Sequence, residues 1–240
     1  LDAYELTGET RYLDIAHSVC GWILSLGREP ASKGVCISYV AYEQSSIHNS
    51  NMLGAAMLAR TAKFSVNDEY LKLARAAMEY SCAGQLPEGA WYYGEAEKYH
   101  WVDNFHTGYD LDALKCYVES SGDESFRENL TRGFSYFRDV FFDSSGRPRY
   151  YNNRAYPIDI QCASQAIDTL VKFSEYDQSN LDLALRVAEW TIENMQDPQG
   201  YFWYRLLPLK KVKAPMIHWG QATMFKALSS LLLAFKNRER

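Results

Sequence analysis

The sequence predicts an all-α fold, an α/α toroid built from repeated helical hairpins, and three observations favour it. Helices with an aromatic residue near one end recur at steps of 58, 56 and 54 residues, at Trp22, Tyr80, Tyr136 and Trp190. A glycine follows each of these helices at a similar step, at Gly34, Gly89, Gly146 and Gly200. Behind each glycine, a loop of ~20 residues or more leads into a second, more apolar helix. Recurrence at this period predicts one structural unit used several times.

Each repeat starts with a polar hinge, which is followed by a charged helix. The four hinges are TGETRYL, SVNDEYL, SGDESFR and YDQSNLD. Their Ser, Thr, Asp and Asn side chains can accept hydrogen bonds from the free N–H groups of a helix start. We therefore expect amphipathic, solvent-facing outer helices over residues 10–27, 68–84, 124–141 and 179–196.

The second helix of each repeat is rich in alanine, leucine and small residues, so it should be buried. These inner helices are expected over residues 50–65, 106–121, 160–175 and 219–237. Short β-like hairpins are expected in the preceding loops, at the aromatic patches Tyr39–Tyr42, Trp91–Tyr93, Tyr150–Tyr151 and Phe202–Tyr204. In a toroid, those loops all open on one face.

The extent of the chain suggests an incomplete ring. A complete toroid of six hairpins needs more than 240 residues at this period, so we expect about four to five hairpins. The opening LDAYELTG has the pattern of a helix already under way, which predicts one domain over residues 1–240 without its N-terminal helices. The alternative fold is a linear solenoid, whose repeats usually run ~33–47 residues with short loops.

An incomplete ring would leave apolar side chains of the last helix uncovered. The residues concerned are Leu228, Leu231, Leu232, Leu233 and Phe235. Large exposed apolar patches favour association, so we expect a homodimer through this helix or poor solubility of the chain.

Composition narrows the classes of partner. With 47% hydrophobic residues and a net charge of −5, the chain can form a substantial core, and its mild acidity argues against nucleic acid. The 18 Tyr and 6 Trp favour a carbohydrate or small-molecule surface. Five cysteines without metal-binding spacing fit buried, reduced thiols in a cytoplasmic protein, and no apolar run could span a membrane. No phosphate-binding loop or serine-hydrolase elbow is present, and we expect no cofactor and no metal.

Polar and aromatic side chains gather where loops become inner helices. The richest junction runs from Tyr99 to Leu114, YHWVDNFHTGYDLDAL, and equivalent junctions lie at residues 46–58, 156–170 and 215–228. A helix N-terminus offers free N–H groups and the positive end of the helix dipole. Because a toroid places these termini at one end, we expect the four junctions to converge on one cavity.

One of these junctions resembles a known family. Trp101-Val102-Asp103 is similar to the Trp-x-Asp motif of the unsaturated uronyl hydrolases, within the six-hairpin glycosidase-like superfamily. In that family the Asp is a general acid/base that hydrates the vinyl ether of a 4,5-unsaturated uronic acid, with a second Asp from a neighbouring hairpin. The resemblance implies these roles for Asp103 and for Asp159, which lies 56 residues on.

The residues after Asp103 depart from that family. They resemble uncharacterised bacterial toroid proteins linked to surface polysaccharides, so hydrolysis, elimination and epimerisation all stay open. The predicted catalytic residues are Asp103, His106, Tyr109 and Asp159. Paired carboxylates suit acid/base work on a sugar, but an Asp at this position can also simply cap its helix.

Further junction residues are predicted to bind an acidic oligosaccharide or polysaccharide. Histidine can neutralise a uronate, the planar fork of Arg154 suits a carboxylate, and tryptophan can stack on a sugar, although core filling is the ordinary use of tryptophan. The predicted set is His48, Asn51, Trp91, His100, Trp101, Asn104, Tyr151, Arg154, Trp203, His218, Trp219 and Gln221. The alternative function is a non-catalytic, glycan-binding scaffold in polysaccharide assembly.

Overall fold

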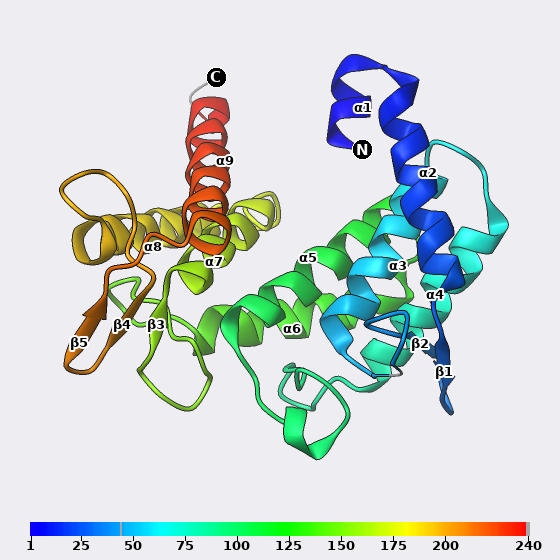
Figure 1. The fold of residues 1–240 in the computed structure, drawn as a ribbon, viewed down its shortest axis with the longest axis horizontal. Coiled ribbons are helices and arrows are strands. Elements are labelled where there is room, and N and C mark those ends of the chain that lie inside the picture. Colours follow the sequence, from blue (N-terminus) through cyan, green and yellow to red (C-terminus); the bar gives the residue numbers. More distant parts are fainter. Residues whose placement is uncertain (44, 239–240) are drawn as a thin grey trace. The chain divides into compact units, whose positions relative to one another are not determined.

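The computed structural model describes residues 1–43 and 45–238, and its helices follow the predicted order (Figure 1). Each predicted helix is present with its ends shifted by only a few residues, and the opening segment is itself helical. The helices are α1 Asp2–Thr7, α2 Thr10–Ser25, α3 His48–Ala62, α4 Asp68–Ala83, α5 Asn104–Ser121, α6 Arg127–Val140, α7 Ile160–Lys172, α8 Ser179–Met195 and α9 Thr223–Arg238. A π-helical turn, Ile217–Ala222, leads into α9.

Three of the four predicted hinges start their outer helix as the sequence suggests. Asn67 accepts hydrogen bonds from the backbone N–H groups of Glu69 and Tyr70, 3.0 and 3.2 Å away. Asp123 and Asp177 each accept from the backbone N–H two residues on. These caps satisfy N–H groups that a helix start leaves without an intrahelical partner.

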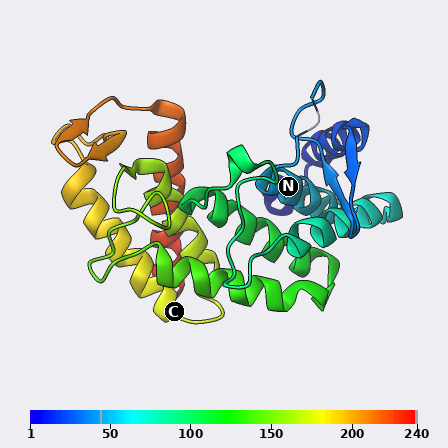
Figure 2. The ribbon, with the colours of Figure 1, turned by 90° about the horizontal axis from the view of Figure 1, so that it is seen from below.

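The chain forms two compact units. Unit 1 comprises Leu1–Trp101 and Asp110–Ser135, and unit 2 comprises Val102–Tyr109 and Tyr136–Arg240. In unit 1, α3 packs against α4 and α2. In unit 2, α7 packs against α8 and α9 (Figure 2). The inner helix α7 is buried at nearly every position of its first three turns, which confirms its predicted inner place.

The last helix, α9, exposes part of the apolar surface predicted for it. Leu232 is 71% exposed and Leu233 is also exposed, as expected. The prediction was wrong for Leu231, which is only 4% exposed because it lies on the side of α9 that packs against its neighbours in unit 2. Leu228 and Phe235 are half-buried. The homodimer itself stays a prediction.

The β-hairpins were predicted at the aromatic patches, but the regular strands lie beside these patches in the sequence. Strands β1 Arg28–Pro30 and β2 Val35–Ile37 form one antiparallel hairpin. Strands β3 Ile158–Asp159, β4 Arg205–Leu207 and β5 Lys210–Val212 form a second antiparallel sheet in that order. The patches form only single bridges, such as Asp103 with Tyr151. Trp91 and Trp203 are buried, so packing holds these rings without a strand ladder.

Three of the four recurring glycines make a repeated backbone contact, and Gly200, with open space around it, does not. Gly34, Gly89, Gly146 and Gly200 all have positive φ, between 68° and 108°. A Cβ on Gly34 would lie 2.1 Å from the Ala76 carbonyl oxygen in α4, and one on Gly89 would lie 2.5 Å from the carbonyl oxygen of Arg132 in α6. Gly146 meets the backbone of Arg186 in α8 in the same way. Only glycine combines this φ with such a close approach.

The structure tests two expectations from composition, which are buried cysteine thiols and the absence of a membrane-spanning helix. Cys20, Cys36, Cys82 and Cys162 are buried and Cys116 is half-buried, which confirms buried thiols. Over residues 1–43 and 45–238, no helix combines the length and apolar character that a membrane span requires.

Asp168 links α7 to α9 in unit 2 and provides a test of the packing. Its buried carboxylate lies 2.6 Å from Lys226 Nζ and 2.9 Å from Lys172 Nζ. Burial raises the pKa of Asp168, but the two lysines outweigh burial and hold this pKa below its ordinary value. Asp168→Asn should lower the free energy of unfolding at pH 7 by ~1.5–3 kcal/mol.

The sign of the pH dependence follows from the lowered pKa of Asp168. Its contribution is present above the unfolded-state pKa of about 4 and is lost as the pH falls through the folded-state pKa. Urea unfolding should therefore show a gap between wild type and Asp168→Asn that shrinks below about pH 4. Asp182→Asn, at an exposed ion pair with Arg238, is the control and should change little. A gap that stays constant down to about pH 2 would contradict this role.

Candidate functional site

Asp103 and His106 form a hydrogen-bonded pair at the start of α5 in unit 2. Asp103 Oδ1 accepts from the His106 backbone N–H at 3.0 Å, and Oδ2 lies 2.7 Å from His106 Nδ1. The carboxylate is 1% exposed, whereas the imidazole is 20% exposed. Because a carboxylate only accepts hydrogen bonds, it places the imidazole proton on Nδ1 and makes Nε2 the basic nitrogen. Asp103 thus caps α5 and also orients His106.

Asp159 has two partners that hold both of its oxygens. Oδ1 accepts from the Gln161 backbone N–H at 2.9 Å, which caps α7. Oδ2 accepts from Arg205 Nε and Nη2 at 2.8 and 2.7 Å. Burial raises the pKa of the Asp159 carboxyl more than the bonds from Gln161 and Arg205 lower it. These contacts match the capping alternative that the sequence left open.

Tyr150 and Arg205 are site residues that the sequence analysis missed. The Tyr150 carbonyl accepts from the Asn104 backbone N–H at 2.8 Å, so this tyrosine lies beside the start of α5. Burial, and then the charges of Cys162, Asp103, Tyr151 and Asp159, raise the pKa of Tyr150. The Arg205 guanidinium lies 5.4 Å from the Tyr150 ring centroid. Tyr150 therefore neighbours both predicted carboxylates. In the sequence, the feature that could have identified Tyr150 as a site residue is its position next to Tyr151, which was predicted to bind substrate.

Arg154 presents an exposed cation on the loop that bridges to Asp103 through Tyr151. Tyr151 forms backbone bridges with both Asp103 and Arg154, and the exposed Arg154 guanidinium lies 4.1 Å from the Tyr151 ring centroid. No carboxylate among the described residues pairs with Arg154. Asn104 is fully buried, and its side-chain oxygen and nitrogen have no hydrogen-bond partner in the described part of the chain. Tyr109 is half-buried, with its ring edge-on to Phe105.

The fourth junction, also in unit 2, divides into structural and exposed residues. Gln221 accepts from the Phe202 backbone N–H at 2.9 Å and donates to the Phe202 carbonyl at 2.7 Å, so it fastens the aromatic patch to the π-helical turn. Trp203 is buried beneath Lys211 and Lys213, which rules out an open sugar platform. His218 and Trp219 are exposed and stacked, with ring centroids 4.7 Å apart. A π-helical turn is frequently found at functional sites.

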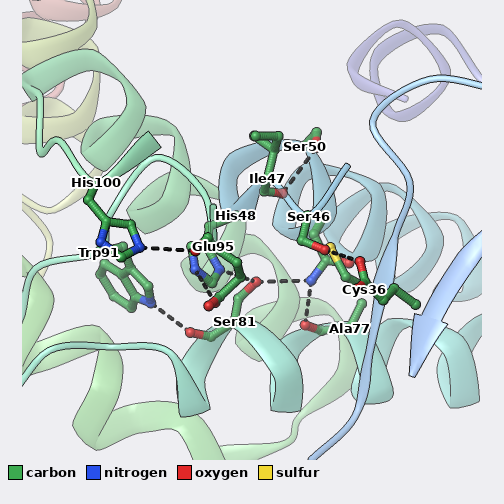
Figure 3. A network of polar contacts seen from close by, with 12 residues as sticks. Cys36, Ser46, Ile47, His48, Ser50, Ala77, Ser81, Trp91, Glu95 and His100 are labelled. Atoms are coloured by element: carbon green, nitrogen blue, oxygen red, sulfur yellow. Dashed lines mark hydrogen bonds and ion pairs between the residues drawn. The ribbon is translucent and has the colours of Figure 1, made fainter. Parts of the chain in front are cut away.

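In unit 1, His48 lies at the centre of a polar network (Figure 3). Its buried ring places Nδ1 3.2 Å from Ser81 Oγ and Nε2 3.0 Å from Glu95 Oε1. The hydrogen bond from His48 lowers the pKa of Glu95. A Cβ on Gly84 would approach His48 Cε1 to 2.8 Å and Glu95 Oε1 to 3.3 Å, so glycine there leaves room for this pair. Glu95 was not predicted, because no local motif marks it.

Two predicted binding residues of unit 1 turn out to stabilise this network. Asn51 accepts from the Ile37 backbone N–H at 2.9 Å and donates to the Ala77 carbonyl and to Ser81 Oγ. Trp91 is buried and donates from Nε1 to the Ser81 carbonyl at 2.8 Å. Their polar atoms are therefore used within the protein.

The other predicted residues of unit 1 form stacked aromatic pairs. His100 stacks on Tyr92 with ring centroids 4.3 Å apart, and Trp101 stacks on Tyr93 at 4.8 Å. His100 is exposed, and Trp101 is half-buried. Within residues 1–43 and 45–238, no three His, Cys, Asp or Glu side chains gather in a way that could hold a metal ion. Convergence of the four junctions on one cavity stays a prediction, since they are divided between the two units.

Comparisons with known proteins show the fold of the chain. No family model matches it, and no curated protein does. Among solved structures, the Lin0763 protein from Listeria innocua is 12% identical, with a TM-score of 0.78, over 98% of this chain and 69% of that one. An unsaturated glucuronyl hydrolase specific for heparin is 12% identical, with a TM-score of 0.72, over 98% and 72%.

A sugar epimerase from a ruminal bacterium is similar to the same extent. It is 13% identical, with a TM-score of 0.71, over 97% of this chain and 68% of that one. The long loops into the inner helices and these matches agree with a toroid rather than a linear solenoid. The chain therefore has an all-α fold of the α/α-toroid class.

Proposed function

We propose that this protein is a carbohydrate-active enzyme that acts on an acidic oligosaccharide or polysaccharide, with His106 as its acid/base group. The Asp103–His106 pair is the observation that supports this best. A buried carboxylate hydrogen-bonded to a partly exposed imidazole is a common arrangement for proton transfer, because it fixes both the tautomer and the orientation of the ring. The protein folds that were matched include sugar hydrolases and epimerases, which fits the substrate class.

The contacts of the carboxylates favour proton removal from carbon over glycoside hydrolysis by an Asp pair. Asp103 is engaged with His106, and both oxygens of Asp159 are held by α7 and Arg205. A histidine base suits a uronate, whose C5 proton is acidic because it lies next to the carboxyl group. Arg154 would bind that carboxylate and stabilise the charge that develops as the proton leaves.

Removal of the C5 proton can lead to β-elimination. His106 Nε2 takes the C5 proton, the C5–H electron pair becomes the C4=C5 double bond, and the C4–O bond breaks. The leaving oxygen receives a proton from water or from Tyr109. Return of the proton to the opposite face of C5, without bond cleavage, would be an epimerisation. Both reactions need the same base and the same carboxylate clamp.

A non-catalytic, glycan-binding function is the second candidate. The exposed His218–Trp219 stack favours it, since sugars stack on aromatic faces without any acid or base. Binding of uronate polymers without turnover, unchanged in Asp103→Asn, would favour this candidate.

The test is a turnover screen with polygalacturonate, alginate, hyaluronan and unsaturated uronyl disaccharides, with neutral mannan as the control. We expect new unsaturated ends, detected by ultraviolet absorbance, from at least one uronate polymer and none from mannan. Arg154→Gln should raise KM about tenfold or more, because it removes a charge-assisted carboxylate contact. Arg11→Gln, at an exposed arginine of unit 1, is the matched control and should behave as wild type. Hydration of the unsaturated disaccharides instead would assign hydrolase chemistry.

A further inference from the structure

We propose that Glu95 and the aromatic pairs beside it form a second saccharide subsite, in unit 1, which selects a neutral or amino sugar and disfavours a uronate. The inference rests on the carbohydrate-active part of the proposed function, but it concerns binding and not the proton transfer at His106. Neither Glu95 nor any uncharged sugar entered the sequence-based predictions.

Glu95 is an oriented and accessible carboxylate. Oε1 is held 3.0 Å from Nε2 of His48, whose own ring is 3% exposed and cannot turn freely because Nδ1 lies against Ser81 Oγ. The Glu95 backbone N–H also donates to the Ser46 carbonyl at 3.1 Å. The Glu95 side chain is nevertheless 49% exposed. A surface glutamate is usually mobile and loses conformational entropy when it binds a ligand. Because Glu95 is already fixed, it can accept hydrogen bonds from sugar hydroxyl groups with little further loss of side-chain entropy.

Aromatic side chains lie in the same loop as this carboxylate. Nε2 of His100 lies 3.0 Å from the Glu95 carbonyl oxygen (Figure 3). His100 also stacks on Tyr92, so this ring pair is fixed to the same loop as Glu95. Trp101 stacks on Tyr93 a few residues away, and Tyr99 packs edge-on to Trp101. Aromatic faces with one oriented acceptor match the general composition of a sugar subsite, because C–H faces stack and hydroxyls donate.

The charge of Glu95 favours some sugars over others. The hydrogen bond from His48 keeps the pKa of Glu95 low, so the carboxylate is ionised at neutral pH. An ionised carboxylate repels a uronate and attracts the ammonium of an amino sugar. In unit 2, by contrast, Arg154 is an exposed cation, whereas Arg205 is paired with Asp159. Unit 1 and unit 2 therefore differ in the charge of the sugar that each would favour.

The test is titration of the whole protein with glucosamine oligosaccharides and, separately, with glucuronate, by calorimetry and ligand-observed NMR. In an Arg154→Gln background, which removes the proposed uronate contact of unit 2, the protein should bind glucosamine at least fivefold more tightly than glucuronate of the same length. Glu95→Gln in this background should lose at least fivefold in glucosamine affinity and should narrow the discrimination against glucuronate. Trp101→Ala should weaken glucosamine binding. Glu97→Gln, at an exposed neighbouring glutamate, is the matched control and should bind as wild type.

Several results would overturn the subsite. The first is that the wild-type protein binds neither sugar. The second is that Glu95→Gln and Glu97→Gln change the binding equally. The third is that the Glu95→Gln protein melts at the wild-type temperature and keeps the wild-type selectivity. His106→Asn separates the two proposals, because it should leave glucosamine binding intact. Glu95-dependent binding without any turnover would refute only the proposed function. Turnover of a uronate polymer with Glu95-independent binding would refute only the subsite.

Discussion

His106→Asn should lower the turnover number on a uronate polymer by about 10²–10⁴-fold, which is the usual contribution of a general acid/base. Asparagine cannot exchange a proton in this way, whereas it can still donate through its amide to Asp103. The helix cap at Asp103 Oδ1 uses the His106 backbone N–H, which the substitution keeps, so the variant should fold normally. KM should change little, because Arg154 is untouched. Single-turnover and steady-state kinetics on the same substrate measure the effect.

Asp103→Asn should also impair turnover, but by another route. The amide can donate to Nδ1 of His106, which would shift the imidazole proton to Nε2 and leave the wrong tautomer for proton abstraction. Asparagine caps a helix about as well as aspartate, so the free energy of unfolding should change by less than ~1 kcal/mol. His17→Asn is the control, since His17 bonds Tyr70 in unit 1 and has no role in the proposed chemistry. Full turnover in His106→Asn would remove His106 from the mechanism.

Gly34→Ala should lower the free energy of unfolding by more than ~3 kcal/mol, because two effects add at this position. Gly34 has a φ of 68°, which disfavours any L side chain. The added Cβ would also lie 2.1 Å from the Ala76 carbonyl oxygen and 2.6 Å from the Tyr80 backbone nitrogen. Neither neighbour is the end of a flexible side chain, so the turn and α4 would have to separate.

Gly8→Ala separates the two effects, because Gly8 has a φ of 70° but open space around it. It should lower the free energy of unfolding by ~1–2 kcal/mol, the price of the left-handed conformation alone. Urea unfolding of both variants measures the difference. Equal destabilisation by the two substitutions would show that the contact with α4 does not limit the stability of the fold.

The helix positions could be predicted closely because their determinants are local. Asn67 accepts from N–H groups two and three residues away, and the apolar spacing of α7 lies within one turn or two. The strands were harder to place, because Trp91 and Trp203 have the composition of strand residues but are held by packing instead. Local propensity for strands yields to such packing.

For the candidate site too, local features could be predicted, whereas features that depend on packing could not. The junctions were predicted, and His106, Asp103 and Arg154 of unit 2 do lie at one helix start and its bridged neighbour. Asn51 and Gln221 stand at junctions too, yet their amides bond backbone groups of the preceding loop. From the sequence alone these amides could not be distinguished from residues that bind substrate.

The sequence by itself determined the repeat, the order of the helices and the residue types at each junction. These follow from hydrogen-bond caps and apolar periods that act over a few residues. Only the tertiary structure decided which polar atoms are already used and which remain accessible. Asp159 meets Arg205 46 residues away, and the buried His48 fixes Glu95 at a similar separation. No local pattern encodes such pairings, because their energy depends on burial and approach that exist only once the hairpins have packed.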